Sequence, residues 1–168
     1  FFPEARTLAY TDAVLLPGLI ATPFIWLGAP LIVVYNTLLF GSIVLSGLGA
    51  WLLAKRLTGS DLAGIVAALV FAFGPYRFDH YQHLELQASF GIPWVLLALE
   101  DVMARGRWRD ALNVGLAFAV LVFCSIYYAI FTATLAPLYC LIRWGWRGLV
   151  HARHAGKVGQ GGRQGFGD

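Results

Sequence analysis

The stretch LIVVYNTLLFGSIVLSGLGAWLL, residues 31–53, contains no charged side chain and is long enough to cross a lipid bilayer as a single helix. One crossing needs about 20 predominantly apolar residues. Small side chains recur every four residues in this stretch, at Ser42, Ser46 and Ala50. That spacing places them on one face of a helix, where they allow a second helix to approach closely. The stretch therefore predicts a transmembrane helix that packs inside a bundle.

The composition of the whole chain agrees with a membrane environment. The sequence is 59% hydrophobic and only 12% charged, whereas a soluble domain is about 25% charged. The net charge of +3 does not indicate nucleic-acid binding, because the basic residues lie in short clusters between apolar runs. Cys124 and Cys140 fall inside apolar runs without a CxxC spacing. We interpret both as small lipid-buried residues rather than redox or metal ligands.

The segments on either side of residues 31–53 predict further helices. Residues 12–27 precede a Gly-Ala-Pro turn and predict a short helix at the membrane interface. The run 111–142 has 32 uncharged residues, too long for one span, so we divide it around Ser125 into two short crossings. With helices expected at 62–76 and 90–99, the fold class is an all-α, polytopic membrane bundle of about five crossings or part-crossings. A turn with an N-cap is expected at 58–61.

Three regions follow from these patterns. Residues 1–30 are expected to form an interfacial segment on the outer face, and residues 31–144 the transmembrane helical domain. Residues 145–168 contain 8 glycines in 24 positions and no apolar period, which predicts a disordered cytoplasmic tail. The sequence begins at Phe1 without a signal peptide, and we expect it to be an N-terminally incomplete fragment whose partners include the remaining helices of the full-length protein.

The distribution of Lys and Arg predicts an orientation. With the spans drawn above, Arg6 and Arg77 lie on one side, and the other side carries Lys55, Arg56, Arg105, Arg107, Arg109, Arg143 and Arg147. Short loops rich in Lys and Arg stay in the cytoplasm. We therefore expect an integral protein of a bacterial plasma membrane, with residues 75–87 outside.

Titratable side chains gather in PYRFDHYQHLELQ, residues 75–87, which we call the polar segment. If residues 76–87 form one helix, Asp79, His83 and Gln87 share a face, with His80 beside them. Arg77, about a turn below His80, offers a planar fork of donors that suits a phosphate. An imidazole at neutral pH can donate a hydrogen bond or pass a proton.

Three interpretations of the polar segment stay open. It can be a solvated loop, a contact for a ligand or substrate, or a metal site in which Asp79 joins His80 and His83. A third metal ligand is not evident on that face, so we expect neither a metal nor another cofactor. Asp12 is a second candidate: it precedes 42 uncharged residues and also fits an N-cap for the helix that follows.

The order of these motifs resembles a known family. A helix that ends in a basic pair and "LTGS" is followed by an alanine-rich helix ending in "PYR", an outer "HxxHL", "IPWVLLALE", "RGRWRDAL" and a helix ending in Ser-x-Tyr-Tyr. This order, over residues 7–143, is similar to bacterial multi-spanning membrane proteins of the GT-C glycosyltransferase type. The resemblance implies transfer of a sugar from a polyprenyl-phosphate donor on the outer membrane face.

The resemblance also implies roles for particular residues. Asp12 matches the region of the outer loop where the superfamily places an acidic catalytic residue. Arg77, His80 and His83 match the "PYR…HxxH" positions and, with Asp79, are the expected contacts of the lipid-linked donor. The alternative is a non-catalytic membrane component, such as a transporter or export-complex subunit, that binds its ligand at the same segment. The charges lie at helix ends rather than at mid-membrane, which favours the enzyme.

Overall fold

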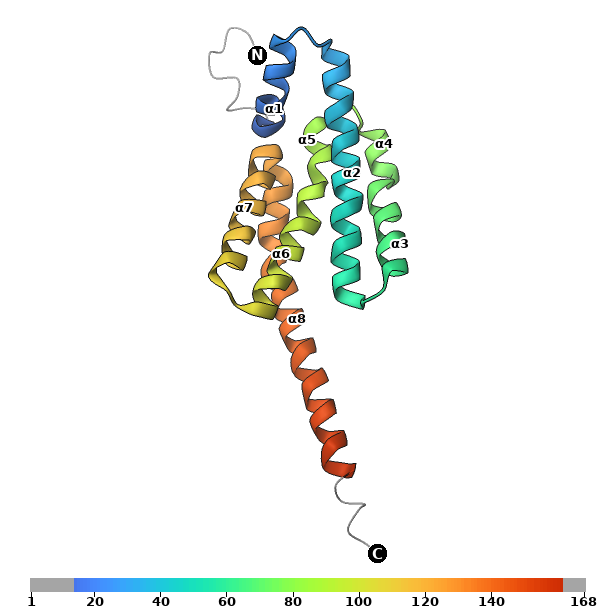
Figure 1. The fold of residues 1–168 in the computed structure, drawn as a ribbon, viewed down its shortest axis with the longest axis vertical. Helices are drawn as coiled ribbons and strands as arrows, with labels where there is room; N and C mark the ends of the chain where they lie inside the picture. The colour runs from blue at the N-terminus through green and yellow to red at the C-terminus, as the bar shows by residue number, and fades with distance from the viewer. Residues whose placement is uncertain (1–13, 162–168) are drawn as a thin grey trace, which may run out of the picture. The chain divides into compact units, whose positions relative to one another are not determined.

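The computed structural model describes the backbone of residues 14–161 and the side chains of residues 14–146, 148 and 149. All regular elements in this part of the chain are helices, shown in Figure 1. They are α1 (Leu15–Trp26), α2 (Leu31–Thr58), α3 (Asp61–Ala72), α4 (Pro75–Asp79), α5 (Leu84–Gln87), the 3-10 helix η2 (Ala88–Phe90), α6 (Gly91–Arg105), α7 (Trp108–Cys124) and α8 (Ile126–Gly161). The chain forms two compact units, residues 1–132 and 133–168, which divide within α8.

The first unit is built around α2. Helix α3 lies beside α2 and runs in the opposite direction (Figure 1), and α6 also packs against α2. The small residues Ser42, Ser46 and Ala50 are all buried, which confirms the predicted stripe for close helix approach. Because lipid is as apolar as Leu, close backbone approach and interhelical hydrogen bonds hold such helices together. One of these bonds joins the Trp94 indole N–H to the Leu45 carbonyl at 3.0 Å.

The connection between α2 and α3 follows the predicted turn. Gly59 takes a left-handed conformation with φ 73°, and its N–H donates to the Lys55 carbonyl at 2.8 Å. The Ser60 hydroxyl then accepts from the Ala63 N–H at 3.3 Å, which confirms the N-cap. Helix α2 continues to Thr58 rather than ending at residue 53, because its basic pair suits a helix C-terminus and Gly59 supplies the stop.

Helices α6, α7 and the start of α8 share a hydrophobic core. Val95, Leu121 and Ala129 are its buried members, and Phe118 and Tyr128 pack against them. The predicted break in the long apolar run is confirmed: α7 ends at Cys124, and Ser125 adopts extended dihedrals before α8 begins.

Within the described residues, four helical segments are long and apolar enough to cross a membrane: Leu31–Thr58, Asp61–Asp79, Leu84–Arg105 and Ile126–Trp146. Large apolar side chains are exposed over the helices, with Leu62 and Val70 each 71% exposed. A water-facing protein rarely exposes so much contiguous apolar surface. The chain is therefore an all-α helical bundle with the character of an integral membrane protein.

Helices α1 and α8 also differ from the sequence-based expectation. Helix α1 begins at Leu15, not at residue 12, because Val14 has a left-handed conformation with φ 42° that cannot continue a helix. Helix α8 extends to Gly161, through residues expected to be disordered from 145 onward. Extending an existing helix avoids the cost of nucleation, which a separate tail would have to meet. Residues 162–168 of the predicted tail lie outside the described residues.

The contact between α6 and α7 is tight at Gly91, and an added methyl group should weaken the fold. A Cβ at this position would lie 2.5 Å from Leu121 Cδ1 and 3.0 Å from its Cβ. Leu121 is fully buried and has little room to move. Gly91→Ala should lower the free energy of unfolding in detergent by about 1–3 kcal/mol.

Gly115→Ala on α7 is the matched control, because a Cβ there meets nothing within 4 Å. It should leave the free energy of unfolding unchanged or raise it slightly, since Ala favours helix over Gly. Equal effects of the two substitutions would show that α6 and α7 are not in close contact at Gly91.

Candidate functional site

The polar segment is not one helix. Helix α4 ends at Asp79, His80 is its C-cap, and α5 begins only after His83, whose dihedrals are extended. The predicted single face carrying Asp79, His83 and Gln87 is therefore wrong. Two short helices joined by a turn replace it, and they send Arg77 and Gln87 inward while His83 and Asp79 stay exposed.

Arg77 is the centre of a buried hydrogen-bond cluster. Its side chain is 6% exposed. One terminal nitrogen donates to the Gln87 amide oxygen at 3.2 Å. The other donates to the Ser89 hydroxyl at 2.6 Å and to the Ser46 hydroxyl on α2. Arg77 thus connects α4 to α2, α5 and η2.

The Gln87 amide completes the cluster. Its nitrogen donates to the carbonyl oxygens of Arg77 at 3.1 Å and of His80 at 2.9 Å. These bonds fix the end of α4 and the turn behind it. Within residues 14–146 no carboxylate forms an ion pair with Arg77, so neutral oxygens alone offset the cost of burying its charge. This inward arrangement differs from the predicted contact between Arg77 and an outer phosphate.

Two tyrosines hold the rest of the polar segment in place. The Tyr35 hydroxyl on α2 donates to the Tyr81 carbonyl at 2.7 Å, and the Tyr128 hydroxyl on α8 donates to the Leu86 carbonyl at 3.1 Å. The sequence analysis did not assign these roles to Tyr35 or Tyr128. No spacing rule points to them, because their partners are backbone carbonyls more than 40 positions away along the chain.

The two histidines remain accessible. The His80 ring stacks on Tyr76 with 4.1 Å between ring centroids, and its Nδ1 lies 2.9 Å from the Tyr76 carbonyl oxygen. His83 Nδ1 lies 3.1 Å from Glu85 Oε1. The rings of His80 and His83 are 6.4 Å apart, centroid to centroid. The described residues contain no group of three or more His, Cys, Asp or Glu side chains that could hold a metal ion.

Asp12 lies outside the described residues, so its predicted catalytic role stays a prediction. Asp79 is exposed at the end of α4. The structure thus gathers Arg77 and Gln87 in one buried cluster, whereas His83 is exposed and His80 is half-buried.

An apolar cleft of about 230 Å³ reaches the polar segment. Its walls are apolar except for Thr37 and Ser42, and Leu84 lines it between His83 and Glu85. A second hollow of about 330 Å³ shares three wall residues with it and extends to Asn113 on α7. The cleft is lined by Leu16, Pro17 and Ile20 of α1, Thr37, Leu38, Gly41, Ser42 and Leu45 of α2, Leu84, Ala88 and Phe90, and Val120 and Cys124 of α7.

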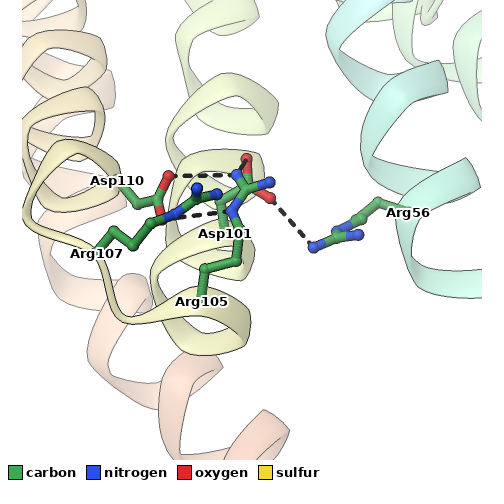
Figure 2. A network of polar contacts seen from close by, with 5 residues as sticks. All are labelled: Arg56, Asp101, Arg105, Arg107 and Asp110. Carbon is green, nitrogen blue, oxygen red and sulfur yellow. Dashed lines mark hydrogen bonds and ion pairs between the residues drawn. The ribbon is translucent and has the colours of Figure 1, made fainter.

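A network of ion pairs, shown in Figure 2, lies at the opposite end of α2 and α6. Asp101 accepts from Arg56 of α2 at 3.2 Å and from Arg105 at 2.6 Å. Asp110 of α7 contacts Arg105 at 3.3 Å and Arg107 at 3.4 Å. The sequence analysis used these arginines only for orientation. The i,i+4 spacing of Asp101 and Arg105 is the signal that could have indicated a pair.

The same network sets the charge state of Asp110. Desolvation raises the pKa of this carboxyl. Hydrogen bonds from Arg105 and Arg107 and their positive charges together lower it by more, so the net pKa is below its ordinary value. Asp110 is therefore ionised near neutral pH and ties the α6–α7 turn to both arginines.

Comparison of the chain with protein-family models, with curated proteins and with solved structures finds no match. The assignment of a function therefore depends on the residues and the geometry described above.

The buried cluster predicts that Arg77 cannot be replaced by Lys. Lysine offers one point charge in place of a fork, so it cannot reach Ser46, Ser89 and Gln87 together. Arg77→Lys should lower the free energy of unfolding in detergent by at least about 1.5 kcal/mol, the scale of one hydrogen bond to a charged group.

Arg109→Lys is the matched control, because Arg109 is exposed and contacts the Trp108 ring at 5.6 Å. Its effect should stay within about 0.5 kcal/mol. A wild-type unfolding free energy in Arg77→Lys would contradict the buried cluster.

Proposed function

We propose that this chain belongs to a membrane enzyme that transfers a sugar from a polyprenyl-phosphate-linked donor on the outer face of the membrane. The observation that carries the proposal is the apolar cleft, because one of its lining residues, Leu84, belongs to the polar segment. An apolar cleft suits a hydrocarbon chain, and polar side chains on the segment that forms part of its wall suit a charged head group. Leu84 connects the cleft to the polar segment, because it lines the cleft and lies between His83 and Glu85 in the sequence.

The polar segment supplies the groups that the head group would meet. Arg77 is held by internal partners, so the ring nitrogens of the exposed His83 and the half-buried His80 are the groups available to a phosphate or an acceptor hydroxyl. The buried guanidinium still acts at a distance, because no carboxylate among the described residues is paired with it and the surroundings have a low dielectric constant. Its positive charge favours an anionic group beside η2.

The reaction also requires that the polar segment face outward. Arginine is more frequent at one end of the bundle than at the other. The ends of α2 and α6 and the start of α7 lie away from α4 and α5 (Figure 1), and they carry Arg56, Arg105, Arg107 and Arg109. Lys- and Arg-rich loops stay in the cytoplasm. We therefore place the polar segment on the outer face of a bacterial plasma membrane.

Labelling of introduced cysteines checks this orientation. In a background with Cys124→Ala and Cys140→Ala, a membrane-impermeant thiol reagent should label Gln82→Cys in intact cells. It should label Arg109→Cys only after the membrane is permeabilised. Labelling of Arg109→Cys alone in intact cells would reverse the orientation and contradict the proposed site.

Filling the cleft should weaken binding of the lipid. A Cβ at Gly41 meets nothing within 4 Å, and Gly41 lines the cleft. A leucine side chain there should fit and fill the space. We expect Gly41→Leu to weaken binding of a polyprenyl phosphate at least tenfold, about 1.4 kcal/mol, as measured by native mass spectrometry from detergent.

Gly115→Leu is the matched control, since Gly115 also has free space around its Cβ and does not line the cleft. Equal binding by Gly41→Leu and the control would contradict the proposed lipid site.

Sugar transfer itself is tested by the release of polyprenyl phosphate from a panel of polyprenyl-phosphate hexoses. Binding without release from any donor would favour the non-catalytic alternative.

A further inference from the structure

The two accessible histidines have different hydrogen-bond partners, although they lie only three positions apart. His80 Nδ1 is 2.9 Å from a backbone carbonyl oxygen, which can only accept. His80 therefore carries its proton on Nδ1. His83 Nδ1 is 3.1 Å from the Glu85 carboxylate, which also accepts when it is ionised. The same reasoning places a proton on Nδ1 of His83.

Both neutral rings then present an unprotonated Nε2 as their second nitrogen. The two rings differ in how well their partners stabilise an imidazolium, which forms when Nε2 takes a proton. The carboxylate beside His83 stabilises it more than the carbonyl beside His80 does. His83 is 49% exposed at its side chain, and Glu85 is 25% exposed. The pair is thus accessible to water for proton exchange, and the contact with Glu85 orients the His83 ring.

The position of the pair connects it to the cleft. Leu84, the residue between His83 and Glu85, lines the cleft from α5. Backbone bonds keep this turn in place: the His83 N–H donates to the His80 carbonyl at 3.0 Å, and the Leu86 N–H donates to the His83 carbonyl at 3.0 Å. The ring of His80 lies 6.4 Å from the ring of His83, centroid to centroid.

We propose that His83 is the general base of the sugar transfer and that Glu85 is its positioning residue. The inference rests on the proposed function and names the base of that same site. His83 Nε2 takes the proton of the acceptor hydroxyl as its oxygen bonds to the anomeric carbon of the donor sugar. The bond from that carbon to the phosphate oxygen breaks, its electron pair stays with the oxygen, and polyprenyl phosphate leaves. Glu85 holds the imidazolium until the proton passes to water.

The tautomers can be measured without any substrate. Nitrogen-15 NMR of ring-labelled histidine in the detergent-solubilised protein should show Nδ1–H and an unprotonated Nε2 for both rings at neutral to mildly alkaline pH. His80→Gln and His83→Gln assign the signals. Glu85→Ala should change the signals of His83 and leave those of His80 in place. A proton on Nε2 of His83, or a His83 signal that ignores Glu85→Ala, would overturn the pair.

The kinetic test uses the release of polyprenyl phosphate from the hexose donors. His83→Gln should slow release by about 10²–10⁴-fold, the usual contribution of a general base, with polyprenyl phosphate binding unchanged. Gln82→Ala, the matched control at an exposed position of the same segment, should leave release near the wild-type rate. Added imidazole should restore part of the activity of His83→Gly, which a merely structural histidine would not allow.

The outcomes separate this inference from the proposed function. Wild-type release that persists in His83→Gln overturns the base and leaves the transfer intact. If the wild-type protein releases no polyprenyl phosphate from any donor, the proposed sugar transfer is overturned. The role of His83 as its general base is then overturned too, whichever tautomers are measured.

Discussion

The fold of the first unit depends on one buried cation. Arg77 places a guanidinium among Ser46, Ser89 and Gln87, and through them it joins α4 to α2, η2 and α5. Burying a charge without an ionic partner costs desolvation free energy, which the hydrogen bonds of the guanidinium offset. Loss of one acceptor would therefore destabilise the fold. The arrangement therefore specifies where the turn of the polar segment must lie. The exposed position of His83 and the half-buried position of His80 follow from it.

Lipid sets the second constraint. Because the exterior is apolar, hydrophobic burial contributes little to helix association, and contact depends on small residues and polar bonds. Ser46 serves in both ways, as part of the small stripe on α2 and as an acceptor for Arg77. At the other end, Asp101 links Arg56 of α2 to Arg105 of α6. The first unit is thus held by polar contacts near both ends, and by the Gly91–Leu121 contact of α6 and α7.

The sequence was a good guide to the helices and a poor one to the candidate site. Apolar runs and the turn at Gly59 predicted α2, α3 and the break at Ser125, because bilayer thickness and backbone hydrogen bonding restrict such segments to helices. The predicted face through Asp79 and His83 was wrong, because local periodicity assumed one helix. Bonds from the Gln87 amide to the carbonyls of Arg77 and His80 stabilise a turn instead.

By itself, the sequence determined that the chain is an all-α membrane bundle, since composition and run length depend only on the solvent that each segment requires. It also determined where the titratable groups gather. Only the tertiary structure decided which of those groups face inward. Ser46 lies 31 positions from Arg77, and Leu84 reaches a cleft whose other walls come from α1, α2 and α7. Contacts between distant segments depend on how helices pack, and no local pattern of residues encodes that packing.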